Sequence, residues 1–503
     1  MNKRYIKLIG LVMLITTFTG CKKWIESNPH DRFVVTDLDY LKSESDYRTM
    51  AVSVYSPLQW LNQVVVIGDI ASDNSVAGGE SASDVLPLQQ IDDFTLTSTN
   101  STLYDLWQVA YEGVNRSNYL IQYKEKNKAG ETVDFNGKDA LYGEIYFLRA
   151  YYYFTLVKMW GDVPLFTNGR FDNNDAKSLK RAPKAEVYAQ IETDLKAAIA
   201  ALPVNQDQKG RVTKYAAQAL LGKVYLYENK FNDADAVLEP IITSNAFSLV
   251  SDYASIYLAA GENGPESVFE IQYTNGSPYY NWGGATRGQG NYAVQQNGIR
   301  GINGSAAMPY AAGWSTNLPT QNLAAAYAAG DQRKAITAFD IEAYKTAHPE
   351  YGITYQVAPY KNTGLYNGKY LPRKGETSGQ VELNYLNNFR VLRYAEVLLM
   401  AAEANNRSTT PNDLKAQDYL NRVRARAFGD DTHKVTAAGN TLKQAIWDER
   451  RLELAMDGDR FFDLVRTGQA ATKLTGFVAG KHEVFPIPQE EINVTGIPQN
   501  TGY

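Results

Sequence analysis

The spacing of small and large apolar residues between Leu221 and Leu238 constrains the fold more than any other feature of the chain. Two small residues, Gly222 and Ala234, mark points where two helices can approach closely. Large apolar residues surround them at helical intervals, at Leu221, Tyr225, Phe231 and Leu238. This is the spacing of a tetratricopeptide unit, which is a pair of antiparallel helices.

The same spacing occurs before and after this unit, which predicts a stack of helix pairs with a continuous core. The earlier unit carries Ile191, Leu195, Ala198 and Pro203, and the later one carries Ala416, Leu420 and Val423. Further helices are expected at residues 46–61, 104–128, 138–159, 389–405 and 441–456. Residues 63–102 are rich in Ser, Asp, Gly and Thr and are expected to be loops.

Residues 246–388 differ from this pattern, because helical periodicity is weak there and Gly, Asn, Tyr and Trp are frequent. Its aromatic residues include Tyr279, Tyr280, Trp282, Tyr292, Tyr310 and Trp314. The predicted fold class is therefore mainly α. A tetratricopeptide-like scaffold, at about 40–245 and 389–470, would carry a large irregular, loop-rich insertion at about 246–388. Loops on a rigid scaffold are where binding residues usually lie.

The N-terminus predicts a lipoprotein signal peptide at residues 1–21. Basic residues precede a short apolar run from Ile6 to Phe18, and small residues lead to Cys21, the one cysteine in the chain. The apolar run is too short to span a bilayer and fits a signal peptide. We expect the Cys21 thiol to be acylated, which would anchor the protein to the membrane by lipid. Lys22 and Lys23 begin the tether that follows.

Composition excludes several classes of function. The net charge of -5 gives no basic field that would attract nucleic acid. The four histidines are scattered, without H-E-x-x-H spacing, and the chain has neither a G-x-S-x-G elbow nor a phosphate loop. Asp457 and Asp459 are too few for calcium, which takes about six to eight oxygen ligands. We therefore expect no metal, no cofactor and no enzyme activity.

Several segments resemble signatures of the SusD/RagB family of Bacteroidetes outer-membrane nutrient-binding lipoproteins, and together they reach from the lipobox to the last residue. The segments are 149–164, 181–188, 388–403, 449–466 and 485–503. The resemblance implies one SusD-like domain at residues 22–503. It also implies a cell-surface protein that holds an oligosaccharide for a partner TonB-dependent, SusC-like outer-membrane transporter.

The charged residues within these signatures are expected to be structural rather than ligand-binding. They lie on helices that are otherwise built to pack, and a charge is buried at low cost only when it is paired. The residues are Arg149, Arg393, Glu396, Glu403, Glu449, Arg450 and Arg460.

The candidate site follows from what a sugar demands of a protein. The apolar C–H face of a sugar ring stacks on Trp or Tyr, and its hydroxyls need planar or charged partners. Candidate stacking platforms are Trp282, Tyr292, Tyr310 and Trp314. Candidate polar contacts are Asp69, Asp73, Asn74, Arg287 and Gln289. Trp60 lies on an expected helix and is predicted to pack rather than bind.

Three alternatives stay open on the sequence alone. A peptide-binding protein would keep the same scaffold and partner. A glycan-degrading enzyme would need two carboxylates facing one cleft, and Asp69, Asp73 and Asp84 are the residues to examine. A tetratricopeptide scaffold that only organises other proteins would bind no small ligand.

Overall fold

The computed structural model describes residues 41–171, 176–280, 288–356, 360–378 and 383–503. The described chain divides into two units. The smaller unit comprises residues 41–49 and 123–135, where the Tyr47 hydroxyl donates a hydrogen bond of 3.1 Å to the Tyr123 carbonyl. The larger unit comprises residues 50–122 and 136 onward, and it holds the elements discussed below.

Long helices form the first part of the larger unit. The elements from residue 44 to residue 243 are α3 (Glu44–Tyr55), which begins in the smaller unit, α4 (Leu58–Leu61), α5 (Gln63–Ile70), β1 (Ser75–Val76), α6 (Leu86–Asp92), α7 (Ser101–Gln122), α8 (Lys138–Trp160), β2 (Val163–Pro164), η2 (Ala176–Ser178), β3 (Arg181–Ala182), α9 (Lys184–Ala201), α10 (Lys214–Tyr227) and α11 (Phe231–Thr243). α8 packs on α7 and α9 and is buried along most of its length.

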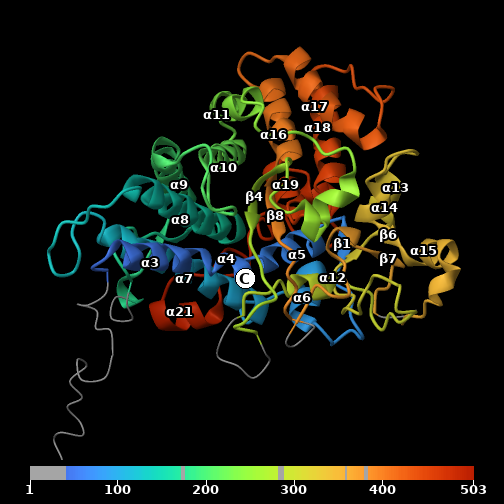
Figure 1. Cartoon of the computed structure of the whole chain (residues 1–503), viewed down its shortest axis with the longest axis horizontal. Coiled ribbons are helices and arrows are strands. Elements are labelled where there is room, and N and C mark those ends of the chain that lie inside the picture. The colour runs from blue at the N-terminus through green and yellow to red at the C-terminus, as the bar shows by residue number, and fades with distance from the viewer. Residues whose placement is uncertain (1–40, 172–175, 281–287, 357–359, 379–382) are drawn as a thin grey trace, which may run out of the picture. The chain divides into compact units, whose positions relative to one another are not determined.

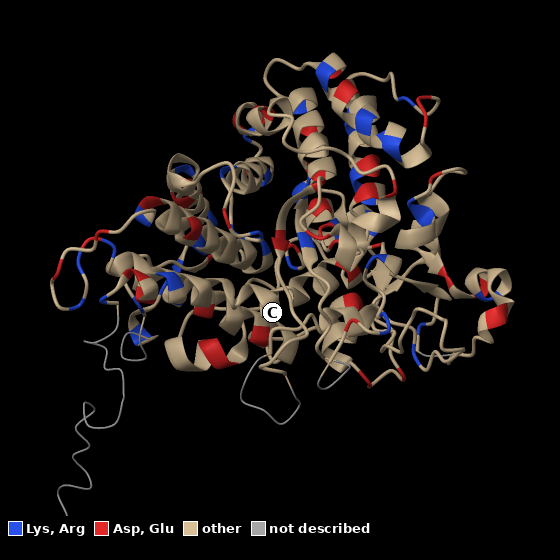
Figure 2. Ribbon diagram, viewed as in Figure 1, with Lys and Arg blue, Asp and Glu red and all other residues tan. Residues whose placement is uncertain are grey.

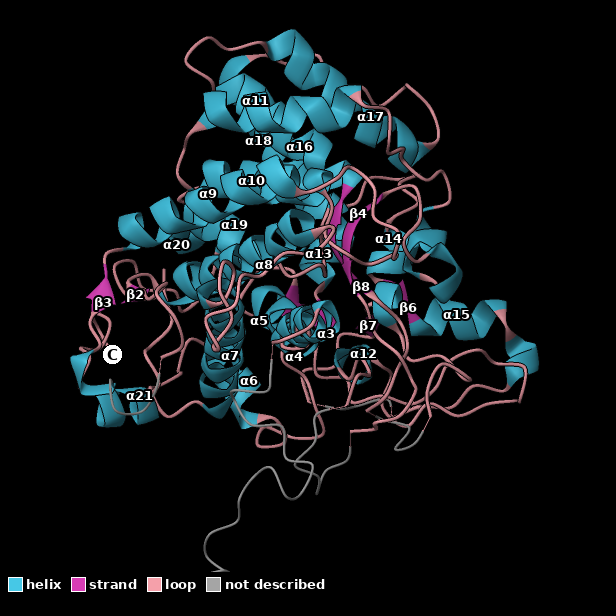
Figure 3. Ribbon diagram, turned by 60° about the vertical axis from the view of Figure 1, so that its left-hand side comes forward, coloured by secondary structure: helices cyan, strands magenta, loops and turns pink. Residues whose placement is uncertain are grey.

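The middle of the chain holds only short elements. They are η3 (Tyr253–Tyr257), η4 (Ala259–Gly261), β4 (Ser267–Ile271), α12 (Ala293–Asn297), β5 (Leu318–Pro319), α13 (Gln321–Ala326), α14 (Lys334–Thr337), β6 (Phe339–Asp340), α15 (Ile341–Ala347), η5 (Pro349–Tyr351), β7 (Leu365–Tyr366), η6 (Gly368–Tyr370) and β8 (Phe389–Arg393). Figure 3 shows loops rather than helices around α12, α15 and β7. The described strands pair in twos and antiparallel, as β1–β5, β2–β3, β4–β8 and β6–β7.

Long helices return in the last part of the chain. They are α16 (Tyr394–Arg407), α17 (Asp413–Phe428) and α18 (Gly439–Glu453), followed by the shorter α19 (Arg460–Arg466), α20 (Ala470–Lys473) and α21 (Gln489–Thr495). The helices pack as a continuous series, in which α9 contacts α10, α10 contacts α11, α11 contacts α16, and α16 contacts α17 and α18 (Figure 1). This confirms the predicted fold class, a mainly helical scaffold with a loop-rich insertion.

Gly222, the small residue of the central repeat, lies where two helices approach closely, as its spacing predicts. A Cβ atom added at Gly222 on α10 would lie 2.5 Å from a methyl carbon of Leu238 on α11. No side chain other than hydrogen leaves room for that contact, so Gly222 sets how closely α10 and α11 approach.

Two helix predictions were wrong in detail. The helix expected at residues 46–61 is divided into α3 and α4, because Pro57 has no N–H to continue the hydrogen bonding of α3. Residues 63–102, expected to be loops, contain α5 and α6. Six of the eight residues of α5 are buried, so packing on all sides stabilises a helix that has no polar face.

The helix expected at residues 389–405 begins later than predicted. Phe389–Arg393 forms strand β8, which pairs antiparallel with β4, and α16 begins at Tyr394. The partner strand Ser267–Ile271 lies far earlier in the chain. Local periodicity therefore could not reveal the pairing, which overrides helix propensity here.

The signature charges form buried ion pairs, as expected. Figure 2 shows acidic and basic residues close together on the helices of the C-terminal part. The pairs are Arg149–Asp194 at 2.6 Å, Arg393–Glu453 at 2.7 Å, Glu396–Lys223 at 3.0 Å, Glu403–Arg466 at 2.8 Å, Glu449–Arg424 at 2.6 Å, Arg450–Asp463 at 3.2 Å and Arg460–Asp73 at 2.7 Å. These pairs join helices to one another and to the loops they support. Among the described residues, no helix has the length and apolar character needed to cross a bilayer.

Candidate functional site

A pocket of about 530 Å³ lies where the helices α4 to α7 meet the insertion. Both parts of the chain line it. The scaffold contributes Trp60, Gln63, Asp84, Val85, Pro87, Leu88, Thr102, Asp105, Leu106 and Val109, and the insertion contributes Tyr280, Tyr292, Gln296, Trp314 and Thr316. A volume of this size is typical of small-molecule sites. We call this cavity the aromatic pocket.

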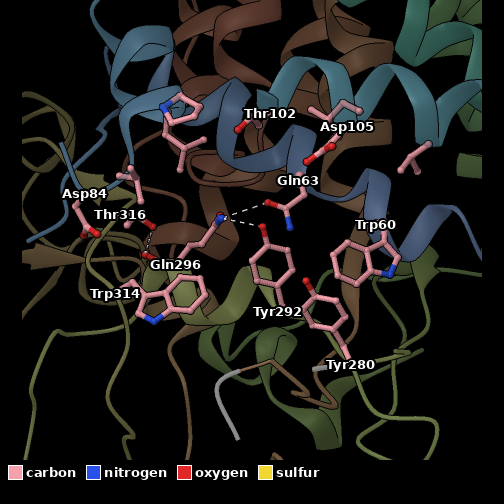
Figure 4. Close-up of a pocket in the computed structure, with 15 residues that line it drawn as sticks. Trp60, Gln63, Asp84, Thr102, Asp105, Tyr280, Tyr292, Gln296, Trp314 and Thr316 are labelled. Carbon is pink, nitrogen blue, oxygen red and sulfur yellow. Dashed lines mark hydrogen bonds between the residues drawn. The ribbon is translucent and has the colours of Figure 1, made fainter. Parts of the chain in front are cut away.

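Four aromatic side chains form a row along one side of the aromatic pocket (Figure 4). The ring of Trp60 lies 4.9 Å from that of Tyr280 and 5.5 Å from that of Tyr292, measured between centroids. The ring of Tyr292 lies 6.1 Å from that of Trp314. The row offers flat apolar surface along the length of the pocket, which suits the C–H faces of successive sugar rings.

A pair of glutamines supplies polar groups beside this row. The side-chain nitrogen of Gln296, on α12, donates a hydrogen bond of 3.2 Å to Gln63 Oε1 (Figure 4). The same nitrogen lies 3.5 Å from the Tyr292 hydroxyl. Gln296 is 5% exposed, and its Oε1 has no hydrogen-bond partner among the described residues. A buried acceptor without a partner is unfavourable, so Gln296 Oε1 is suited to accept a hydrogen bond from a ligand hydroxyl.

Burial also fixes the state of the tyrosine in this group. It raises the pKa of Tyr292, so the hydroxyl keeps its proton at neutral pH and remains a hydrogen-bond donor. The pocket therefore presents donors and acceptors within a mostly apolar wall.

Backbone hydrogen bonds hold the insertion wall in place. The N–H groups of Trp314 and Thr316 donate to the carbonyls of Gln295 and Gln296 at 2.8 and 2.9 Å. These bonds tie the Trp314 segment to the short helix α12, which is why a loop aromatic and a helix amide face the same cavity. The position of Trp314 is thus set by backbone pairing and not by its own side chain alone.

An arginine connects that wall to the scaffold side. Arg300 donates to Asp84 Oδ2 at 2.7 Å and to the Trp314 carbonyl at 2.9 Å. Asp84 also accepts from the Glu80 N–H at 2.8 Å. Asp105 lies on the other side of the pocket from Asp84 (Figure 4). The two carboxylates that line the pocket therefore lie on different sides of it.

The structure brings two of the predicted site residues together. Tyr292 and Trp314 both line the aromatic pocket. Trp282, Arg287 and the predicted lipidation site Cys21 lie outside the described residues.

The predicted polar contacts from the first loop region lie elsewhere. Asp69 is fully buried in α5. Asp73 forms a salt bridge with Arg460, with an O–N distance of 2.7 Å, and Asn74 accepts a hydrogen bond of 2.8 Å from Arg451. None of the three lines the aromatic pocket. Their contacts connect this loop to the C-terminal helices.

The two remaining candidates are also placed apart from the aromatic pocket. Tyr310 packs against Phe339 and Tyr344, each with a centroid distance of 5.4 Å, and the Arg373 guanidinium lies 5.3 Å from its ring centroid. Gln289 lines a second pocket, which also adjoins α4.

Sequence reasoning missed Trp60, Gln63, Tyr280 and Gln296. Trp60 was expected to pack, and it does contact two tyrosines, but it also lines the cavity. The sequence could have indicated Tyr280, because this residue stands in the aromatic-rich insertion. Nothing in the sequence indicated the two glutamines, since an isolated Gln is usually a surface residue. Among the described residues, no group of three or more His, Cys, Asp or Glu side chains is arranged to hold a metal.

Comparison with known families gives two matches along the chain. The family described as "Starch-binding associating with outer membrane" matches residues 24–226, and the family described as "SusD family" matches residues 353–503. SusD-like protein P2 of Formosa agariphila is 26% identical over 98% of this chain and 99% of its own. A SusD-like protein of Bacteroides ovatus is 26% identical over 74% of this chain and 67% of its own.

Solved structures agree with this assignment. A structure described as a laminarin-binding SusD-like protein is 35% identical, covers 92% of this chain and all of its own, and gives a TM-score of 0.81. Surface glycan-binding protein A from Bacteroides thetaiotaomicron in complex with laminarihexaose is 28% identical, covers 91% of this chain and 99% of its own, and gives a TM-score of 0.79. The helical scaffold, the sequence signatures and these matches together show that the chain belongs to the SusD/RagB family.

Proposed function

We propose that this protein is a lipid-anchored outer-membrane receptor that binds an oligosaccharide in the aromatic pocket, without cleaving it. The row of Trp60, Tyr280, Tyr292 and Trp314 is the observation that carries the proposal, because aromatic rings and adjacent amides along one cavity match the two kinds of surface of a sugar ring. The alternative scaffold that only organises other proteins has no use for such a cavity.

The ligand class we propose is a neutral β-glucan of the laminarin type. Two similar structures support this choice, one described as laminarin-binding and one holding laminarihexaose. The pocket chemistry is consistent with a neutral chain. Arg300 already pairs with Asp84, and the amides of half-buried Gln63 and buried Gln296, which line the pocket, are uncharged.

We propose binding without turnover because one of the two carboxylates that line the pocket, that of Asp84, is already engaged by the protein's own donors. Hydrolysis uses two carboxyl groups on either side of the scissile bond, one as acid and one as base or nucleophile. Asp84 is engaged by Arg300 and by a backbone N–H, and Asp105 lies across the pocket from it. The Asp84 carboxylate thus serves to hold Arg300 and the loop beside it.

The proposal extends to the cellular setting. The signal peptide at residues 1–21 would be cleaved just before Cys21, and acylated Cys21 would anchor a SusD-like domain at residues 22–503 to the outer membrane, at the cell surface. The bound glycan would pass to a SusC-like TonB-dependent transporter. The N-terminal sequence supports the anchor, and the matched family description, which names association with the outer membrane, supports the location.

Calorimetry on the mature chain tests the proposal. Laminarihexaose, other neutral oligosaccharides and a panel of peptides would each be titrated, with product analysis on the same samples. We expect binding of laminarihexaose with no new products. Trp60→Ala and Gln296→Leu should each weaken it, whereas Gln444→Leu, at an exposed position on α18, should not.

Each other outcome points to a different function. Cleavage of the glycan would make the protein an enzyme, and binding of peptides alone would make it a peptide receptor. Equal affinity of the wild type and both pocket variants would remove the aromatic pocket from the site.

A further inference from the structure

A second pocket adjoins α4 and encloses about 230 Å³. Its walls come from the end of α3, from α4, from the loop between α9 and α10, from β4 and from Gln289 in the insertion. The lining residues are Val52, Tyr55, Ser56, Leu58, Gln59, Gln208, Lys209, Gly210, Arg211, Glu270, Ile271, Gln272 and Gln289. We call this cavity the amide pocket, because four of its side chains are glutamines.

Fixed hydrogen bonds shape the amide pocket. Gln59 Nε2 donates to the Gln272 carbonyl at 2.9 Å, and the Gln272 amide exchanges hydrogen bonds with Asn263 at 3.0 and 3.1 Å. Gly210 adopts a φ of +84°, and a Cβ atom there would lie 2.4 Å from Gln272 Cγ. The glutamine side chains that form the floor are therefore held in defined positions before any ligand binds.

Polar groups remain available inside this frame. No described residue hydrogen-bonds to the Gln289 side chain, and Gln59 Oε1 likewise has no partner within the described chain. Amides offer both donors and acceptors, which is what sugar hydroxyls require. Val52 adds exposed apolar surface at the rim, with 54% of its area accessible.

Two of the three charged residues that line the amide pocket, Arg211 and Glu270, are already paired, and the third, Lys209, is exposed. Arg211 pairs with Glu144 at 3.1 Å, and its guanidinium lies 5.5 Å from the ring centroid of Tyr55. Glu270 is buried and accepts a hydrogen bond of 3.1 Å from the Asn388 amide. The cavity is thus suited to a neutral polar ligand rather than to a strongly charged one.

The amide pocket and the aromatic pocket share a wall. Gln59 and Trp60 are consecutive residues of α4, and Gln59 lines one cavity while Trp60 lines the other. On the insertion side, Gly288 lies against the backbone of Tyr280, and the next residue is Gln289. Gln59 and Gln289, which line the amide pocket, thus adjoin segments that carry Trp60 and Tyr280 of the aromatic pocket.

We propose that the amide pocket is an extension subsite, which binds further sugar residues of the glycan that the aromatic pocket holds. At about 230 Å³ it is smaller than the roughly 300–1,000 Å³ of independent ligand sites, which argues for a subsite and not for a separate ligand. This inference rests on the proposed glycan-binding function and adds selection for chain length. Affinity rises once the chain is long enough to reach Gln59 and Gln289.

Calorimetry with laminarioligosaccharides of two to seven residues tests this subsite on the full mature chain. For the wild type we expect a step of about tenfold in affinity at one chain length, as a few additional hydrogen bonds form. Gln289→Ala removes an exposed side chain, and Val52→Trp fills the cavity without removing any hydrogen bond. Both should abolish the step, leave the affinity for the short oligosaccharides unchanged, and differ from the Gln444→Ala control.

The outcomes distinguish failure of the extension subsite from failure of the proposed glycan-binding function. If short oligosaccharides bind and affinity shows no step, or if the step survives in both variants, the extension subsite is refuted and the aromatic pocket stands. If no oligosaccharide of any length binds the wild type, the proposed function fails and the subsite fails with it. Loss of affinity for short and long chains alike in both variants would place the amide pocket in the primary site, which also contradicts an extension.

Discussion

Replacing Glu453 tests whether the signature charges hold the scaffold together. Glu453 is fully buried at the end of α18, and three guanidiniums donate to its carboxylate. The distances are 2.9 Å from Arg333, 2.7 Å from Arg393 and 2.6 Å from Arg426. Burial alone would raise the pKa of Glu453, but these three cations outweigh it and hold that pKa well below its usual range.

The expected loss for Glu453→Gln follows from these contacts. Removing one partner of a buried ion pair costs about 3–5 kcal/mol, because the other charge is left uncompensated. Arg393 and Arg426 keep a second carboxylate, that of Glu266, at 2.9 Å each, so the lower end of the range applies. We expect the free energy of unfolding to fall by about 3 kcal/mol, which a domain with roughly 5–15 kcal/mol of stability survives.

Urea unfolding at pH 7, followed by circular dichroism, measures this loss. Glu342→Gln is the matched control, because Glu342 pairs with Lys345 at the surface and an exposed pair contributes about 0–1 kcal/mol. The folded Glu453→Gln protein should still bind laminarihexaose, since Glu453 lines neither pocket. A loss below about 1 kcal/mol would refute the view that this carboxylate holds the three arginines in place.

Three further predictions concern other parts of the chain. Cys21→Ala should release the protein from the membrane fraction, and continued association without lipid would contradict the anchor. Gln296→Leu should weaken laminarihexaose binding about tenfold or more through loss of a buried acceptor, as measured by calorimetry. Burial would raise the pKa of Glu403, but Arg466 outweighs it and lowers that pKa to about 2. Because the folded pKa lies below the unfolded value of about 4.5, stability from this pair is complete above about pH 4.5 and is lost as the pH falls toward 2. When the free energy of unfolding is measured against pH, Glu403→Gln should therefore show a smaller loss of stability over this range than the wild type. An equal loss in both proteins would show that the Glu403–Arg466 pair does not contribute to stability.

The helical repeats could be predicted from the sequence because their contacts are short-range. The spacing of Gly222 and Leu238 encodes the approach of two helices that follow one another in the chain, and the structure has that contact. Strand β8 could not be predicted in the same way, because its partner β4 is separated from it by the greater part of the insertion. Pairing between distant segments leaves no local period to detect.

The aromatic pocket could be predicted only in part, for a related reason. Tyr292 and Trp314 stand out as aromatics in a loop-rich segment, and both line the cavity. Trp60 lies on a helix, where an aromatic residue usually packs, and here it does both. Gln296 gives no signal at all, because its importance comes from burial beside Gln63, and burial arises only once the insertion folds onto the scaffold.

The loop residues Asp73 and Asn74 illustrate why a polar loop is weak evidence for a sugar site in this fold. A loop that is rich in carboxylates and amides has the composition of a sugar site, yet these two side chains bind Arg460 and Arg451. An irregular chain on a helical scaffold must be fixed by specific contacts, since it has few backbone hydrogen bonds of its own, and buried arginines need partners. Polar loop residues that lie against arginines of the helices therefore hold the loop on the scaffold. Aromatic residues are not needed to neutralise buried arginines. A row of them along a cavity is therefore the stronger indication of a ligand site.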